Sequence, residues 1–259
     1  MNQALTIAQK EIVDGLRDVR SVIAALFYAL MGPIVVGLVS LATRAKPGSG
    51  TAFLPGMMVI FTLVSAFVGG MNVAMDTVAG ERERHSLLPL LLNPVGRRTV
   101  VLGKWLTVSF FALIGLAVTV LGFLPVFVSS GMPTPALGPR ILLAIAFGLF
   151  SLPLLAASVQ LLISTVSRTV KEAQTYLSLI VFLPMGMGMF LVFYPAARKA
   201  WSSFLPMVGQ QLQLEGLMSG QPVGLFPSAV LGYLTLAPAI LLLLLTANRL
   251  QRDEIIYGN

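Results

Sequence analysis

The hydrophobic residues of this sequence are gathered into long runs, which short charged connectors separate. Six of these runs contain no aspartate or glutamate, and they cover residues 21–43, 53–75, 108–128, 141–166, 173–194 and 228–248. Each run is at least about 20 residues long, the length that an α-helix needs to cross about 30 Å of hydrocarbon. The pattern therefore predicts an all-α polytopic membrane protein with six transmembrane helices.

Residues 1–20 show a different pattern, in which apolar side chains recur at every third or fourth position. This apolar face consists of Leu5, Ala8, Ile12, Leu16 and Val19, and charged residues occupy the other faces. An amphipathic stretch that leads directly into an apolar run predicts a cytoplasmic elbow helix in the membrane interface. A frayed amphipathic tail is the alternative. The first apolar run is too long for a signal-peptide core, so we expect it to remain as the first span.

Residues 21–259 make up the predicted six-span domain, and the connector before its last span is unusual. Residues 195–227 are only moderately polar and include Trp201, Phe204, Leu212 and Phe226. This segment is too apolar for a solvated loop and too interrupted for a full span. We expect one or two short helices that re-enter the outer leaflet, because irregular backbone is tolerated there when protein or a water-filled cavity covers it. A surface-lying amphipathic loop is the alternative.

Composition and charge add an orientation. The chain is 56% hydrophobic and 10% charged, with a net charge of +7. Most of the 17 lysines and arginines fall in connectors on the same side as the N-terminus. The positive-inside rule then predicts that both termini are cytoplasmic. The same rule explains the excess of basic residues as a consequence of insertion in a lipid bilayer. The net positive charge therefore does not indicate a nucleic-acid partner.

Several kinds of chemistry are excluded by the residues that are present. The chain has no cysteine and one histidine, His85, so a thiolate or multi-histidine metal centre cannot form within one copy. It contains no Gly-x-x-x-x-Gly-Lys-Ser/Thr sequence for binding ATP. The apolar runs also lack the carboxylates that gradient-driven carriers usually use, which disfavours such a carrier. They offer almost nothing from which to build the nucleophile and base, or the metal cluster, of an intramembrane enzyme.

The connector at residues 76–104 is the largest feature on the predicted cytoplasmic side. Its residues 81–84 alternate in charge, and we expect them to hold the end of the second helix in solvent. Ser86 is a good N-cap, and Asn93 followed by Pro94 ends the short leucine-rich helix that it would begin. So short a helix must pack against something. It is a candidate docking surface for another protein, and an ordinary connector is the alternative.

The same segment carries a family resemblance. Residues 76–87 read Asp-Thr-Val-Ala-Gly-Glu-Arg-Glu-Arg-His-Ser-Leu, followed by Leu-Leu-Leu-Asn-Pro-Val at 90–95 and Val-Leu-Gly-Lys at 101–104. This pattern closely resembles the ABC-2 type permease family, and within it the sodium-exporter-like (NatB-like) branch. The six spans, the elbow helix and the membrane-dipping segment are also similar to that family.

The resemblance implies that a coupling helix within residues 76–104 docks on a separate ATPase. Its residues would be Gly80, Glu81, Arg82, Glu83, Arg84, Leu87, Leu91 and Pro94. It further implies a homodimer that works with two copies of a cytoplasmic ABC ATPase, in a bacterial or archaeal plasma (inner) membrane. The ATPase would bind ATP and magnesium, and this chain would need no cofactor. The chain departs from many members at Pro89, where they have an acid.

Inside the runs, three residues are candidates for lining a translocation path, namely Asn72, Gln160 and Met187. For Asn72 and Gln160 the alternative is hydrogen bonding between helices. The small residues Gly69, Gly70, Gly115 and Gly122 are expected to let helices pack closely.

The sequence thus predicts the non-catalytic permease subunit of an ATP-driven exporter, which forms the path and couples to a separate ATPase. An ion-gradient-driven carrier or a channel-like membrane protein without an ATPase is the alternative. The apolar spans fit a lipid, a hydrophobic drug or a peptide as substrate, and the resemblance points to sodium or small toxic compounds.

Overall fold

The structure is a computed structural model that describes residues 2–44, 53–86, 95–130 and 138–250. The described residues contain helices and no strands. Six helical segments are long and apolar enough to cross a membrane: Val19–Thr43, Leu54–Glu83, Arg97–Ser129, Pro139–Val166, Val170–Phe193 and Leu225–Arg249. This confirms the predicted all-α polytopic membrane fold.

The second span is built from several helical pieces. It comprises α3 (Leu54–Val68), α4 (Met71–Met75), the π-helical turn η2 (Asp76–Gly80) and α5 (Glu81–Glu83). The helix thus continues eight residues beyond the predicted end at Met75, and α7 (Arg97–Ser130) begins well before the predicted start at Val108. The apolar pattern missed both extensions because they contain charged side chains.

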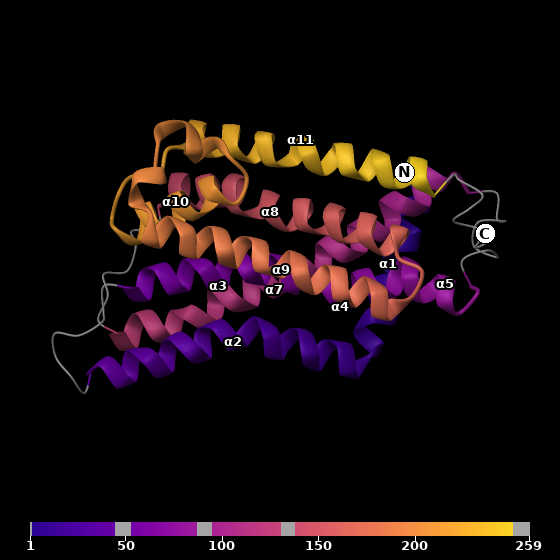
Figure 1. The fold of residues 1–259 in the computed structure, drawn as a ribbon, viewed down its shortest axis with the longest axis horizontal. Coiled ribbons are helices and arrows are strands. Elements are labelled where there is room, and N and C mark those ends of the chain that lie inside the picture. Colours follow the sequence, from indigo (N-terminus) through magenta and orange to yellow (C-terminus); the bar gives the residue numbers. More distant parts are fainter. Residues whose placement is uncertain (1, 45–52, 87–94, 131–137, 251–259) are drawn as a thin grey trace.

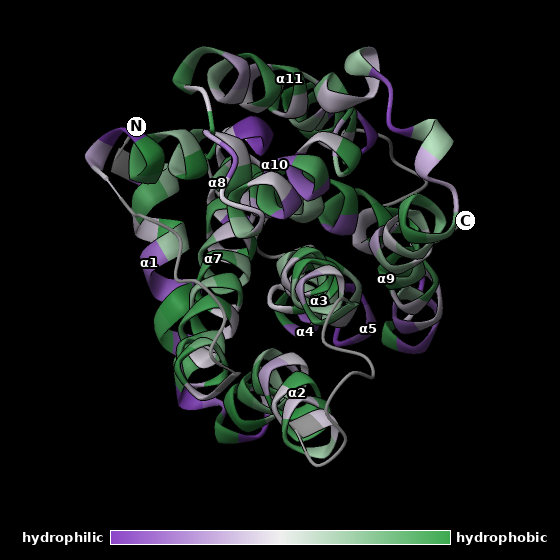
Figure 2. Cartoon of the chain, turned by 90° about the vertical axis from the view of Figure 1, so that its left-hand side faces the viewer, coloured by the Kyte–Doolittle hydropathy of each residue, from purple (hydrophilic) through white to green (hydrophobic). Residues whose placement is uncertain are grey.

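The remaining spans are continuous helices. They are α2 (Val19–Arg44), α8 (Pro139–Val166), α9 (Val170–Phe193) and α11 (Leu225–Arg249). Seen end-on, α3 lies inside the bundle, with α2 and α9 at its periphery (Figure 2). In the second span, which contains α3, and in α8, 56% of the most apolar stretch is buried, compared with 22% in α2 and in α9. The peripheral helices therefore present most of their apolar surface to the outside of the chain.

The two ends of the bundle differ. Helix α1 (Asn2–Arg17), α5, the start of α7 and the end of α11 lie together at one end, here called the α5 end (Figure 1). The opposite end, here called the α10 end, holds the 3-10 turns η3 (Pro195–Ala197) and η4 (Ala200–Phe204) and helix α10 (Val208–Met218) (Figure 1).

Helix α1 packs against α7 through small residues. Ala4 and Ala8 are buried, and a Cβ atom on Gly103 would lie 2.8 Å from Cγ2 of Ile7. The predicted apolar positions Leu5 and Leu16 remain exposed. A helix is thus present where the elbow is predicted, and its location in the membrane interface stays a prediction.

Helix α10 is fixed inside the α10 end by glutamine side chains. The amide of Gln210 donates to the carbonyl of Gly148 in α8, at 3.2 Å, and to the hydroxyl of Thr235 in α11, at 2.9 Å. The segment of residues 195–227 contains the short helical elements η3, η4 and α10, as predicted. The last span begins at Leu225, within the predicted re-entrant range. Re-entry into the outer leaflet stays a prediction.

Candidate functional site

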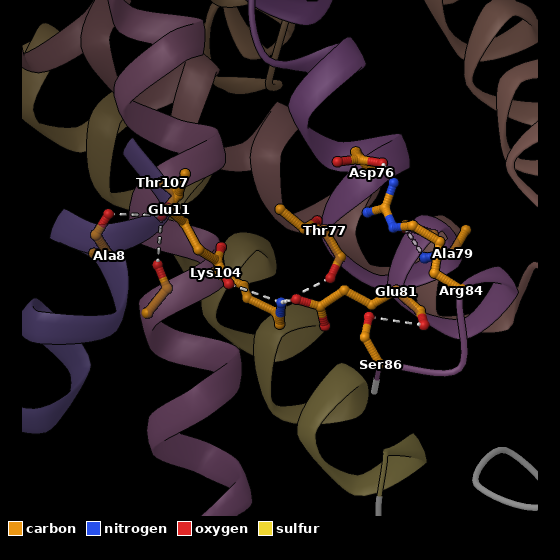
Figure 3. Close-up of polar contacts among 12 residues, drawn as sticks. Ala8, Glu11, Asp76, Thr77, Ala79, Glu81, Arg84, Ser86, Lys104 and Thr107 are labelled. Atoms are coloured by element: carbon orange, nitrogen blue, oxygen red, sulfur yellow. Dashed lines mark hydrogen bonds and ion pairs between the residues drawn. The ribbon is translucent and has the colours of Figure 1, made fainter. Parts of the chain in front are cut away.

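A buried lysine connects three helical elements at the α5 end. The ammonium group of Lys104, on α7, lies 2.8 Å from Oε1 of Glu11 on α1 and 2.8 Å from Oε1 of Glu81 on α5. It also donates to the backbone carbonyl of Thr77 in η2, at 2.7 Å (Figure 3). An ammonium has three donor hydrogens, so these three acceptors can satisfy it completely. We call Lys104, Glu11 and Glu81 the ion triad.

The lysine of the ion triad is buried, whereas the two glutamates line a cleft of about 720 Å³. Lys104 is 0% exposed, and the side chains of Glu11 and Glu81 are 17% and 22% exposed. The second carboxylate oxygens of both glutamates, Oε2, are buried without a hydrogen-bond partner. Burial raises the pKa of Glu11 above its ordinary value of 4.5, although the nearby Lys104 ammonium opposes this shift. Two acids therefore share one buried cation.

The π-helical turn η2 supplies backbone groups to this site. The carbonyl of Thr77 accepts from Lys104, and the amide of Ala79 donates to the hydroxyl of Ser164 on α8, at 3.1 Å. A π-turn widens the helix and alters its internal hydrogen bonds, and such turns occur frequently at functional sites. Here the turn is attached to α7 on one side and to α8 on the other.

Arg82 and Glu83 attach α5 to the junction of α8 and α9. The guanidinium of Arg82 donates to the carbonyls of Ser167, at 2.5 Å, and of Thr165, at 2.7 Å, at the end of α8. The carboxylate of Glu83 accepts from the amide of Val170, at 2.9 Å, in the first turn of α9. Carbonyls at a helix end and amides at a helix start lack intrahelical partners, so these side chains satisfy groups that would otherwise be unpaired.

The fourth residue of the charged run, Arg84, forms an ion pair with Asp76 at 2.8 Å, and both side chains are largely exposed. The expectation that residues 81–84 hold the helix end in solvent is therefore wrong for Glu81 and Arg82. Their side chains turn back to other helices of the same chain, because unpaired helix-end groups and a buried lysine attract them.

The other residues of the predicted coupling helix are only partly described. Gly80 is buried, and a side chain at this position would meet the carboxylate of Asp76. Leu87, Leu91 and Pro94 lie outside the described residues, as does most of the short helix predicted after Ser86. Their role in coupling stays a prediction.

The three candidate path residues lie in different places. Asn72 lines the same cleft of about 720 Å³ between α1, the start of α2 and the α4–η2 segment, and it also borders the apolar hollow next to that cleft. Gln160 is buried on α8, and its amide donates to the carbonyl of Phe67 on α3. Met187 is 41% exposed on α9. The hydrogen bond of Gln160 is the bond between helices that the sequence leaves open as the alternative to path lining. Path lining stays a prediction for all three residues.

The sequence reasoning missed the ion triad. Lys104 was counted among the basic residues and as the last residue of the motif at 101–104, but it was given no partner, and Glu11 was assigned no role. One signal was available, because a lysine followed directly by an apolar run is costly unless it has a partner. Among the described residues, no group of three or more histidines and acids is placed to hold a metal ion.

Comparisons with known proteins agree with the membrane fold. Residues 5–254 match the family described as ABC-2 family transporter protein. The chain is 36% identical over 163 residues to the ABC transporter permease protein NatB of Bacillus subtilis (strain 168), a match that covers 60% of this chain and 41% of NatB. It is 32% identical over 148 residues to the probable ABC transporter permease protein NosY of Pseudomonas aeruginosa, which covers 56% of this chain and 50% of NosY.

These matches span half or less of each relative's own length. The family match, by contrast, extends over nearly all of this chain and includes α1, the ion triad and the six spans. The chain therefore belongs to the ABC-2 transporter family.

Proposed function

We propose that this chain is the non-catalytic permease subunit of an ATP-driven exporter and that a separate ABC ATPase drives it. Family membership and the permease relatives support a membrane subunit. The sequence lacks a Gly-x-x-x-x-Gly-Lys-Ser/Thr motif, so ATP and magnesium would bind to the partner chain.

The observation that carries the coupling role is the attachment of α5. Its three residues contact three other elements of the chain directly, through Glu81 to α7, through Arg82 to the end of α8, and through Glu83 to the start of α9. Lys104 on α7 then links Glu81 to Glu11 on α1. The connector that follows α5 is the predicted docking segment. A displacement of this connector by a partner would therefore reach several spans at once.

The orientation belongs to the same proposal. The start of the chain and the end of α11 lie at the α5 end, as an even number of spans requires (Figure 1). The connectors at this end carry most of the basic residues, which favours the cytoplasmic side of a plasma membrane. We place the partner ATPase at this end and the α10 end outside.

We further propose that two copies of the chain form a homodimer with two copies of the ATPase. In a symmetric dimer the path can lie at the interface between the two copies, which is simpler than enclosing it within the six spans of one chain. The apolar surface of α2 and α9, most of which is unburied within one copy, is available for a second copy and for lipid. In each copy, the cleft beside Asn72 would be an entry to the path from the inner side.

Purification from the native membrane tests this function. Affinity purification of the chain in mild detergent should yield a stoichiometric partner that carries a phosphate-binding Gly-Lys motif, together with vanadate-sensitive ATP hydrolysis. If the chain purifies without such a partner and still moves substrate in vesicles free of nucleotide, an ion-gradient-driven carrier or a channel-like protein is the correct description.

A further inference from the structure

The ion triad is expensive to bury, and its cost indicates a role other than stability. Moving a single charge out of water costs several kcal/mol, and replacing a buried ion pair or triad with apolar residues often leaves stability unchanged or raises it. Here one ammonium faces two carboxylates, and the Oε2 atoms of both have no partner. The arrangement therefore contributes no more to the stability of the helix packing than apolar residues would at the same positions.

The position of the triad relative to the predicted docking segment is more informative. Residues 84–96 join α5 to α7 and are called the connector from here on. Glu81 lies shortly before this connector, and Lys104 lies in the third turn of α7, the helix that follows it. Their ion pair of 2.8 Å ties the helix that enters the connector to the helix that leaves it. Glu11 pairs with the same Lys104 ammonium at 2.8 Å and so ties α7 to α1.

The π-helical turn explains why such a tie is needed. The second span changes from α-helix to π-helix at Asp76, directly before α5. A change of helix type is a place where a helix can bend. Without a brace, a displacement of the connector could be absorbed by bending at η2. The bond from Lys104 to the Thr77 carbonyl, at 2.7 Å, spans this turn from the side.

We propose that Lys104 is a positioning residue, which clamps η2, α5 and α1 to α7 so that they move as one body when the connector is displaced. This proposal rests on the proposed function, since it assumes a partner that displaces the connector. It adds a specific residue through which that motion reaches α1. The contacts of Arg82 and Glu83 with α8 and α9 involve no residue of the triad, so we expect them to remain when the triad is altered.

The deciding variant removes all three charges at once. Substituting Lys104 alone would leave two buried acids without a cation, and the protein could then fail to fold. The triple variant Lys104→Met, Glu11→Gln and Glu81→Gln keeps the sizes of the side chains and leaves no buried charge. A second variant, Lys104→Arg, keeps one cation between the two acids and keeps N–H donors for the carbonyl of Thr77. The matched control is Lys199→Met, an exposed lysine at the α10 end.

The readout is the motion of α1 when the ATPase is trapped with nucleotide. The chain has no cysteine, so single cysteines can carry nitroxide labels. Gln9→Cys on α1 and His85→Cys after α5 replace exposed side chains. In the native complex with its ATPase, vanadate trapping should change the spectra of both labels. The triple variant should keep the change at position 85 and lose the change at position 9.

Lys104→Arg should keep the change at position 9, and Lys199→Met should behave like the unsubstituted chain. Equal nucleotide-dependent changes at position 9 in the triple variant and in the unsubstituted chain would overturn the role of Lys104 while leaving the proposed function intact. If no ATPase purifies with the unsubstituted chain and neither label responds to nucleotide, the proposed function fails, and this role fails with it.

Discussion

Gly69 and Gly115 bring α3 and α7 into direct backbone contact. A Cβ atom built on Gly115 would lie 2.7 Å from the Cα atom of Gly69, closer than real Cβ contacts allow. Gly122 meets a neighbour in the same way, since a Cβ atom there would lie 2.8 Å from Cγ of Pro33 on α2. The prediction that these glycines allow close helix packing is confirmed, because any larger side chain would push the helices apart.

A substitution at this contact should destabilise the bundle. We expect Gly115→Ala to lower the free energy of unfolding by about 1–3 kcal/mol, the usual cost of overpacking a tight core. Gly186→Ala is the matched control, because no atom lies within 4 Å of the Cβ position there. Thermal unfolding of the detergent-purified protein measures both. Equal melting temperatures for the two variants would show that α3 and α7 can separate without cost.

The attachment of α5 to the end of α8 should also be visible in stability. Arg82→Ala removes a charged donor from the carbonyls of Ser167 and Thr165, and we expect a loss of about 1.5–3 kcal/mol. Arg84→Ala is its neighbour and control. It breaks an exposed ion pair with Asp76, which should cost less than about 1 kcal/mol. Chemical unfolding in detergent separates the two cases, and the reverse order would contradict the assigned contacts.

The pH dependence of stability should report on Glu11. Its pKa is raised in the folded protein, chiefly by burial, while Lys104 and Lys10 act to lower it and Glu81 acts to raise it. The folded protein therefore binds this proton more tightly than the unfolded chain does. The stabilising contribution is full at low pH and is lost as the pH rises through the raised pKa of the folded state.

Glu11→Gln removes this dependence. We expect the unsubstituted chain to gain stability relative to Glu11→Gln as the pH falls from about 8 to about 5, because only the unsubstituted chain takes up the proton. Melting temperatures of the two proteins across this range provide the test. A difference that stays constant, or that moves in the opposite direction, would mean that burial does not destabilise the charged form of Glu11.

Gln160→Leu distinguishes the two roles considered for this residue. The substitution removes the hydrogen bond to the carbonyl of Phe67, and such bonds between membrane helices contribute about 0.6 kcal/mol on average and at most about 1.7 kcal/mol. If the bond is the role of Gln160, stability should fall by that amount and transport should be retained. Unchanged stability with altered transport would instead place Gln160 in the path.

The spans could be predicted from the sequence because each is a continuous apolar run, and burial in lipid requires little else. Helix α1 followed from its period of three to four residues, and the short helices near α10 from a segment of mixed polarity. The helical extensions at Glu81–Glu83 and at Arg97 were missed, because charge was taken as a sign of solvent.

The contacts of the site were beyond sequence reasoning for a different reason. Glu11, Glu81 and Lys104 are far apart along the chain, and their pairing depends on how α1, α5 and α7 pack. No local pattern indicates which acid will face a given lysine. Likewise, Arg82 finds the end of α8 only because the second and fourth spans lie side by side. The resemblance at residues 76–104 located the site, and the geometry supplied its connections.

The most direct test of the central claim is a cross-link from the predicted docking segment to the ATPase. Since the chain contains no cysteine, Leu91→Cys introduces a unique thiol between α5 and α7, and Ser219→Cys provides a matched thiol at the α10 end. In native membranes, a short reagent with one thiol-reactive end and one photoreactive end should join Leu91→Cys to a chain that carries a phosphate-binding Gly-Lys motif. Ser219→Cys should give no such product. Reaction of Leu91→Cys with a membrane-impermeant reagent added outside intact cells, and no cross-link to an ATPase, would contradict the account.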